Sequence, residues 1–189
     1  SEIMEGCTVR GPFALGEHAS LKMQAKIYGD TTIGKYSKVG GEVSNSVIFG
    51  YSNKGHDGFL GNSVIGEWCN LGADTNNSNL KNNYGKVSAW SYPDKKYINT
   101  NLQFCGLIMG DHAKAAINTQ FNTGTVVGVC ANVFNEGFPP KFIPDFSWGN
   151  SSVFELEKSY EVAQRVMERR DINLSENDKN ILKFIFENK

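Results

Sequence analysis

Aliphatic residues recur along the first part of the chain at a spacing of six positions. Residues 3, 9, 15, 21, 27, 33 and 39 are Ile, Val, Leu, Leu, Ile, Ile and Val. The spacing of six returns later, first at Ile65 and Leu71 and then at Met109, Ala115, Phe121, Val127 and Val133. A period of six fits neither a helix nor a simple strand, but it fits a coil with three flat faces, each one hexapeptide long. We therefore predict a mainly β protein, a parallel β-helix over about residues 3–135 with three sheets around a thin core. The alternative is an ordinary all-β domain.

The pattern is interrupted twice, at about residues 40–62 and 76–107. We expect both stretches to leave the coil as inserted loops. Within the second, Val87–Trp90 and Tyr97–Ile98 flank the sequence Ser91-Tyr92-Pro93-Asp94, which predicts a β-hairpin. Because loops that leave a rigid scaffold commonly carry function, these stretches are where we expect a site.

The last 39 residues contain neither Gly nor Pro, and 15 of them are charged. This change divides the chain into a coil, residues 1–150, and a helical appendage, residues 151–189. Two amphipathic helices are predicted there, the second beginning at a capping-box pattern of Ser175 and Asp178. Their apolar positions are Leu156, Tyr160, Ala163 and Met167, then Ile181, Leu182 and Ile185. Both apolar faces are narrow, so we expect the helices to pack against another part of the protein, after a connector that holds Pro139, Pro140 and Pro144.

Composition supports this picture and excludes some classes of function. Gly and Asn, which most readily adopt left-handed backbone conformations, number 20 each among 189 residues, so tight turns are frequent. The formal net charge of −1 provides no broad basic surface for nucleic acid or for a membrane. No apolar stretch approaches the ~20 residues of a membrane span. The four cysteines are far apart, and we expect reduced packing residues of a cytoplasmic protein: Cys7, Cys69, Cys105 and Cys130.

Two sequence features carry a resemblance to known families. The repeat of an aliphatic residue, Gly, two variable positions and a small residue resembles the hexapeptide-repeat β-helix family, which implies a left-handed coil. The segment from Gly55 to Ala73, GHDGFLGNSVIGEWCNLGA, resembles without gaps the acetyltransferase half of bifunctional glucosamine-1-phosphate N-acetyltransferase/UDP-N-acetylglucosamine pyrophosphorylase. That family has Gly-His-x-x-Tyr-Leu-Gly-Asp-x-x-Ile-Gly-x-x-x-Asn-Ile-Gly-Ala at this point.

The resemblance implies roles for individual residues. His56 matches the catalytic base of the family, and Glu42 matches an active-site glutamate at the same spacing. Lys26 falls where the family has a phosphate-binding arginine, and Asn70 and Asn79 match asparagines of the family's site and of its Asn-Tyr-Asp-Gly motif.

The chain departs from the family at three of these places. Phe59 replaces a tyrosine, Ser44 replaces a phosphate-binding lysine, and Leu80-Lys81 replaces Tyr-Asp. These changes weaken the case for the identical sugar phosphate, while Phe59 and Lys81 remain candidates for substrate binding. The resemblance further implies that acetyl-CoA lies along the coil near Ala116 and Ile117.

The chemistry fits a histidine at position 56. Acetyl transfer to an amine needs a base for the proton of the nucleophile, and histidine has the unperturbed pKa that suits a base near neutral pH. His18 and His112 lie in coil segments and are expected at the surface. Their spacing does not fit a zinc site, so no metal is predicted, and no GxGxxG or phosphate-loop motif is present. Asn70 and Asn79 have an alternative as corner asparagines.

Two functions therefore stand side by side. The first is an acetyl-CoA-dependent N-acetyltransferase that acts on an amino-sugar phosphate similar to glucosamine 1-phosphate. The second is a non-catalytic β-helix that trimerises or regulates a sugar-phosphate nucleotidyltransferase. The family resemblance implies a homotrimer and an upstream nucleotidyltransferase domain outside this sequence.

Overall fold

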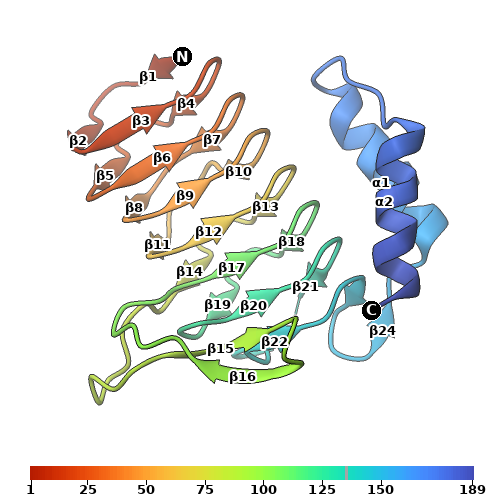
Figure 1. Ribbon diagram of the computed structural model, residues 1–189. Coiled ribbons are helices and arrows are strands. Elements are labelled where there is room, and N and C mark those ends of the chain that lie inside the picture. The colour runs from red at the N-terminus through yellow and green to blue at the C-terminus, as the bar shows by residue number, and fades with distance from the viewer. Residues whose placement is uncertain (135) are drawn as a thin grey trace.

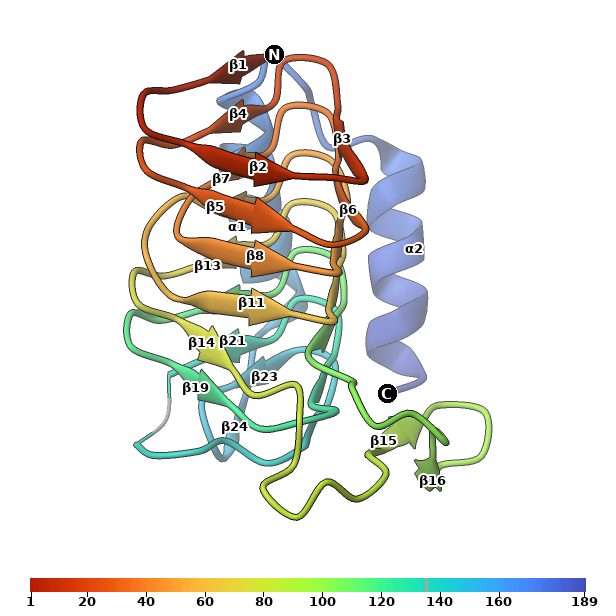
Figure 2. The same cartoon turned by 90° about the vertical axis from the view of Figure 1, so that its left-hand side faces the viewer.

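The computed structural model describes residues 1–134 and 136–189, and it shows a β-helix with two helices along one side (Figure 1). Successive strands visit three sheets in turn, so each strand of the coil pairs in parallel with the strand one turn away, except that Ser147–Trp148 and Ser152–Val153 pair antiparallel. The turns stack along one axis (Figure 2). The mainly β prediction and the prediction of three parallel sheets are confirmed.

Three flat faces surround the core. Face A is formed by β1 (Glu2–Ile3), β4 (Ser20–Leu21), β7 (Lys38–Val39), β10 (Asn53–Lys54), β13 (Asn70–Leu71), β18 (Lys114–Ala115), β21 (Asn132–Val133), β23 (Ser147–Trp148) and β24 (Ser152–Val153). Face B is formed by β2 (Thr8–Arg10), β5 (Lys26–Tyr28), β8 (Glu42–Ser44), β11 (Phe59–Gly61), β14 (Asn76–Asn77) and β19 (Gln120–Phe121). Face C is formed by β3 (Phe13–Leu15), β6 (Thr31–Ile33), β9 (Val47–Ile48), β12 (Val64–Ile65), β17 (Ile108–Met109), β20 (Val126–Val127) and β22 (Phe142–Ile143).

The residues of the six-residue repeat form the core. Leu21, Ile33 and Val39 are completely buried, and the same cluster continues through the later turns. The exceptions lie at the N-terminal end of the coil, which no turn of the described residues covers. Ile3 and Val9 have 55% and 39% of their surfaces exposed, and Leu15 is half-buried.

The expected inserted loop at about residues 40–62 is replaced by further turns of the coil. These residues form strands β8 to β11. Val39 pairs with Lys54 only 15 residues later, whereas Leu21 pairs with Val39 after 18 residues. A turn here is three residues shorter than the preceding one. The coil therefore continues, although the aliphatic residues no longer follow at a spacing of six.

The second interruption does leave the coil. After β14, the chain departs and returns at β17, and the excursion contains an antiparallel hairpin of β15 (Ser88–Ser91) and β16 (Lys96–Asn99) (Figure 2). The predicted hairpin is confirmed.

The expected connector after residue 135 also forms another turn. Phe142 pairs with Val126 on face C, and Trp148 pairs with Asn132 on face A. The prolines of this segment lie outside the paired residues, where a missing backbone N–H costs no ladder hydrogen bond.

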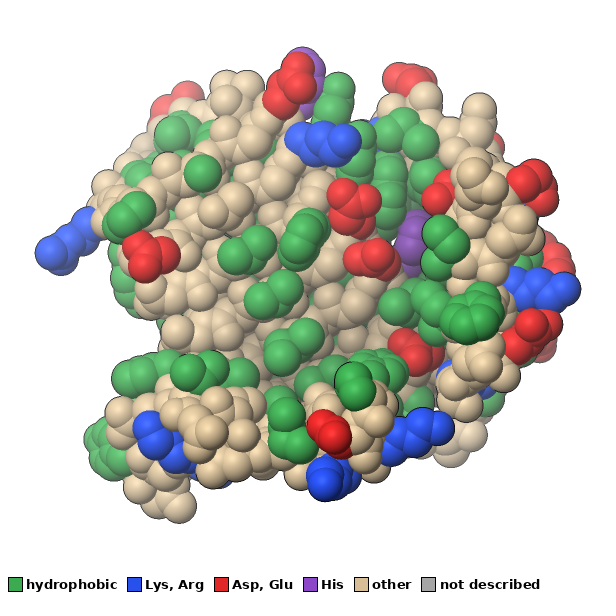
Figure 3. All heavy atoms as spheres, in the orientation of Figure 1, with side chains coloured by type: hydrophobic (Ala, Val, Ile, Leu, Met, Phe, Trp, Pro, Cys, Tyr) green, Lys and Arg blue, Asp and Glu red, His purple; other side chains and the backbone are tan. Residues whose placement is uncertain are grey.

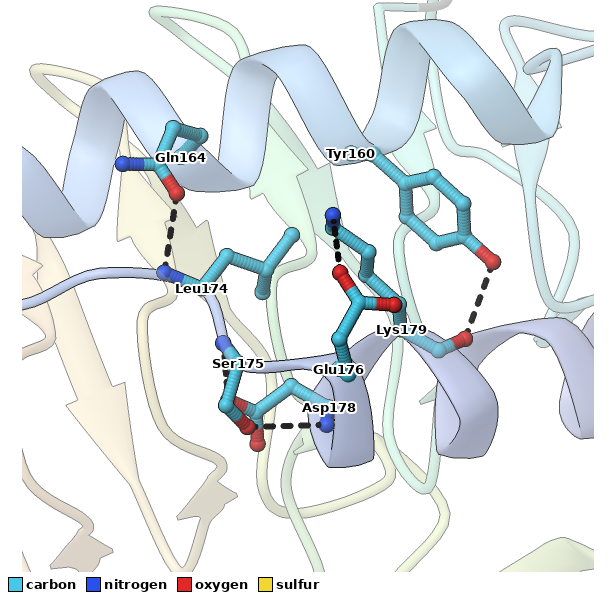
Figure 4. A network of polar contacts seen from close by, with 7 residues as sticks. All are labelled: Tyr160, Gln164, Leu174, Ser175, Glu176, Asp178 and Lys179. Carbon is cyan, nitrogen blue, oxygen red and sulfur yellow. Dashed lines mark hydrogen bonds and ion pairs between the residues drawn. The ribbon is translucent and has the colours of Figure 1, made fainter.

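The two predicted helices are present as α1 (Leu156–Glu168) and α2 (Glu176–Glu187). The predicted capping box begins α2: the amide of Asp178 donates to the Ser175 hydroxyl, and the amide of Ser175 donates to the Asp178 carboxylate. Figure 4 shows this cap beside two bonds that tie the helices together. The Tyr160 hydroxyl donates to the carbonyl of Lys179 at 2.9 Å, and the Leu174 amide donates to Gln164 Oε1 at 2.8 Å.

The helices pack on a column of rings at the corner between faces C and A. This aromatic column consists of His18, Tyr36, Tyr51, Trp68 and His112, one ring from each turn, and every one has a positive φ. The rings of Tyr51 and Trp68 stack with centroids 4.1 Å apart. Ala163 and Met167 of α1 bury Trp68, so the expectation that the helices pack against the rest of the protein is confirmed.

His112 differs from its expected place at the surface. It is 8% exposed, and its Nδ1 has no hydrogen-bond partner among the described residues. Burial, and secondarily the nearby Lys114, lowers the pKa of His112 to about 4, against the attraction of Asp178 on α2. The expectation was wrong because the sequence does not reveal which corner the helices cover.

Candidate functional site

The corner at residues 55–58 joins face A to face B and carries His56. The His56 side chain is exposed. Gly58 has a φ of +113°, and a Cβ there would collide with the carbonyl of Thr75 in the next turn. A glycine is therefore required for the chain to turn at this point and present His56 outward.

A buried lysine supports this corner from inside the coil. Lys54 occupies a position of the aliphatic core column and is 2% exposed. Its Nζ donates to the carbonyls of Gly40 at 3.1 Å and His56 at 2.9 Å. Burial lowers the pKa of Lys54 to about 8, although Asp57 and Asp74 act in the opposite direction. Lys54 could not be recognised from the sequence as a core residue, because the turn that ends at it is shorter than the repeat predicts.

His56, Asn70 and Ile117 line one cavity of about 460 Å³. This cavity, here called the basic cavity, lies between face A and the C-terminal end of α1. Its remaining side chains include four cations: Lys22, Lys38, Arg169 and Arg170. The nearby Arg170 lowers the pKa of Lys38, with burial, Lys22 and Arg169 adding to the effect.

Lys26, Glu42 and Phe59 lie together on face B, as neighbours on three successive strands. They line a second cavity of about 460 Å³, the face B cavity, which Asp57 also lines. The Tyr28 hydroxyl donates to Glu42 Oε1 at 2.6 Å, and this bond raises the pKa of Tyr28.

Two of the remaining candidates lie at the start of the insertion. Asn79 donates from Nδ2 to Asn62 Oδ1 at 2.8 Å. Lys81 donates from Nζ to the carbonyl of Lys86, which places its ammonium inside the inserted segment. In the single chain, neither residue lines the cavity that contains His56.

Ala116 and Ile117 form the corner that follows β18, in the same row as the corner of His56. Both are exposed, and the backbone of this corner packs directly against Gly72. The hydroxyls of Thr75 and Thr119 donate to the carbonyl of Ala116 at 3.2 and 2.8 Å. A rigid corner thus stands beside the basic cavity.

The structure therefore separates the candidates into two groups. His56, Asn70 and Ile117 line the basic cavity, and Lys26, Glu42 and Phe59 line the face B cavity on the other side of residues 55–58. The four cations of the basic cavity could not be recognised together from the sequence, because two come from the coil and two follow α1, more than 100 residues later.

Neither a metal centre nor a membrane span stands out in the described part of the chain. Residues 1–134 and 136–189 contain no group of three His, Cys, Asp or Glu placed to hold a metal ion. Within the same ranges, neither helix has the length and apolar character needed to cross a bilayer.

No family model matches this sequence. The bifunctional protein GlmU of Methanocaldococcus jannaschii is 30% identical to the chain over 113 residues, which are 60% of this chain and 26% of that protein. GlmU of Paracoccus denitrificans is 35% identical over 72 residues, 38% of this chain and 15% of that protein. The chain is distantly similar to GlmU. It spans about a quarter or less of the length of these relatives.

Solved structures with a related fold include AntD, an N-acyltransferase from Bacillus cereus, in complex with dTDP and 3-hydroxybutyryl-CoA. The match covers 90% of this chain and 88% of AntD, with a TM-score of 0.45 and 8% sequence identity. The polySia-specific acetyltransferase NeuO matches with a TM-score of 0.40 and 12% identity, over 77% of this chain and 83% of NeuO.

Proposed function

We propose that this protein is an acetyl-CoA-dependent N-acetyltransferase that acts on an amino-sugar phosphate similar to glucosamine 1-phosphate. The observation that supports this most directly is His56. It stands exposed on a corner held from beneath by Lys54, at the position where the gap-free resemblance over residues 55–73 has its catalytic base. The distant similarity to GlmU agrees with this chemistry.

In the proposed reaction, the amine of the sugar attacks the thioester carbonyl of acetyl-CoA. The new C–N bond forms as the C–S bond breaks, and coenzyme A leaves as the thiolate. His56 accepts the proton that the amine loses and delivers it to that thiolate, so charge and protons balance. Asn70, which lines the same cavity, is placed to orient the substrate.

We assign the face B group to the sugar. Glu42 is fixed by the Tyr28 hydroxyl, and its carboxylate lies in register with Lys26 on the neighbouring strand. Together they offer an acceptor and a donor to sugar hydroxyls, while the ring of Phe59 offers an apolar surface. Acetyl-CoA is proposed to lie near the corner of Ala116 and Ile117.

The assay for this proposal follows acetyl-CoA consumption over a panel of amino sugars and their phosphates. Acetylation of at least one phosphorylated amino sugar, with the free amino sugar as the matched control, is the expected result. Absence of both acetyl-CoA binding and acetylation, with an upstream nucleotidyltransferase domain supplied as well, would exclude the enzyme.

The second candidate is a non-catalytic β-helix that assembles or regulates a nucleotidyltransferase. Apolar side chains lie on the outward surface of face C (Figure 3). They favour an assembly role, since Val47, Val64 and Ile108 are 38–42% exposed. The replacement of a lysine by Ser44 and of a tyrosine by Phe59 favours it too. We propose a homotrimer under either function.

A further inference from the structure

The basic cavity holds an excess of positive charge that the described protein does not neutralise. None of its lining residues is an aspartate or glutamate. Four other cations of the two helices are paired with carboxylates, Lys158, Arg165, Lys179 and Lys183. By contrast, Arg169 and Arg170 make no ion pair with any described residue, and they line the cavity instead.

A structural explanation accounts for only part of this cluster. Basic residues at the C-terminal end of a helix interact favourably with the helix dipole, which suits Arg169 and Arg170 at the end of α1. Lys22 and Lys38 come from the coil and are not part of that helix. Their approach to the two arginines is repulsive, as the lowered pKa of Lys38 reflects.

Arg170, just beyond the end of α1, is also held in place. Arg170 Nη2 donates to the carbonyl of Tyr36 at 3.4 Å, and Val166 of the same helix lines the cavity. An arrangement that keeps four like charges around about 460 Å³ is stabilised by an anion inside it.

The wall of the cavity also offers an unused acceptor. Asn53 lines it, and the Asn53 Oδ1 atom is buried without a hydrogen-bond partner among the described residues. If the side chain turned toward the cavity, a hydroxyl group of a bound molecule would satisfy this oxygen. The cavity thus suits a molecule that carries both a phosphate and a hydroxyl.

The face B cavity differs in charge. There Lys26 is accompanied by the carboxylates of Glu42 and Asp57, so the lining has more negative than positive groups. A phosphate dianion is disfavoured beside two carboxylates.

We propose that the basic cavity is the phosphate-binding site of this protein, in which Lys22, Lys38, Arg169 and Arg170 hold a phosphate group beside His56. The inference rests on the proposed function only for the source of that phosphate, which is either coenzyme A or the amino-sugar phosphate. Lys26, the position that the family resemblance indicates, is not the phosphate ligand.

The test is isothermal titration calorimetry of the full chain with two pairs of probes. Coenzyme A is compared with 3′-dephospho-coenzyme A, and glucosamine 1-phosphate with glucosamine. The variants are Lys22→Gln/Lys38→Gln on the coil and, separately, Arg169→Gln at the C-terminal cap of α1. The matched control for the double variant is Lys158→Gln/Lys183→Gln, which removes the same two charges from exposed positions outside the cavity.

Both cavity variants should lower the affinity for a phosphorylated probe roughly tenfold or more, as expected for lost hydrogen bonds to a charged group. The control should bind each probe within about twofold of wild type. If only the affinity for coenzyme A falls, or only that for glucosamine 1-phosphate, the result identifies which molecule supplies the phosphate. Unfolding temperatures confirm that each variant is folded.

Unchanged binding of both phosphorylated probes in a folded cavity variant overturns the proposal. A wild type that binds neither probe at millimolar concentration overturns it too. The acetylation assay separates the two proposals. Binding as expected without acetyl transfer contradicts the enzyme but not the site, whereas transfer that is unaffected in Lys22→Gln/Lys38→Gln contradicts the site but not the enzyme.

Discussion

At the scale of single residues, His56 has the most direct proposed role. The change His56→Ala should lower the acetylation rate by about 10²–10⁴, the usual contribution of a general base. The coil should remain folded, because the side chain is exposed. Initial rates and an unfolding curve measure both effects. His18→Ala, another exposed histidine at a corner, is the matched control, and full activity in His56→Ala contradicts the assignment.

The buried Lys54 should make the stability of the fold depend on pH. Its pKa is about 8 in the folded state and 10.5 ordinarily, so the unfolded chain holds the proton more strongly. The fold should therefore gain up to about 3 kcal/mol of stability from this group as pH rises from 8 to 10.5. In Lys54→Met this gain is absent. Chemical denaturation of both proteins at several pH values measures the difference, and parallel curves across that range would be the contrary result.

At the scale of elements, the docking of the helices on the aromatic column determines how His112 behaves. The pKa of His112 is about 4 in the folded state against 6.5 ordinarily, so the unfolded chain binds the proton first as pH falls. The stabilisation that comes from keeping His112 neutral is complete above about pH 6.5. It is lost progressively toward pH 4, by up to about 3 kcal/mol.

The variant His112→Phe keeps a ring in the column but cannot titrate. Its free energy of unfolding should change less than that of wild type between pH 6.5 and 4. Denaturant melts at both ends of this range measure the change. An identical pH dependence in the two proteins would mean that other groups carry it.

The elements also show what the sequence could predict. The six-residue repeat, the hairpin around Ser91–Asp94 and the cap at Ser175 are local patterns, and each was confirmed. The turn ending at Lys54 escaped detection, because its shorter length breaks the count of six.

The site was predictable only in part, because only some of its residues belong to a local sequence pattern. His56 lies in a local motif, but the basic cavity depends on where α1 docks, which no local pattern encodes. Lys22 and Arg169 are far apart in the sequence and line one cavity only in the folded protein.

At the scale of the whole molecule, we predict a homotrimer. A thin coil buries little surface per turn, and the apolar side chains of face C gain by being covered. Light scattering at micromolar concentration should give three times the mass of one chain. Val64→Lys, which places a charge in the middle of that face, should shift the mass toward the monomer. A stable monomer in the wild type would exclude this assembly.

The path of the chain has a consequence for biosynthesis. Each turn of the coil contacts mainly its neighbours, so the turns can wind in order as the chain leaves the ribosome. The rings of Tyr51 and Trp68 then remain uncovered until residues 156–174 have been made. Because Arg169 and Arg170 arrive with those residues, the basic cavity does not exist in the nascent coil. A ribosome-bound coil would therefore display His56 before the proposed phosphate site has formed.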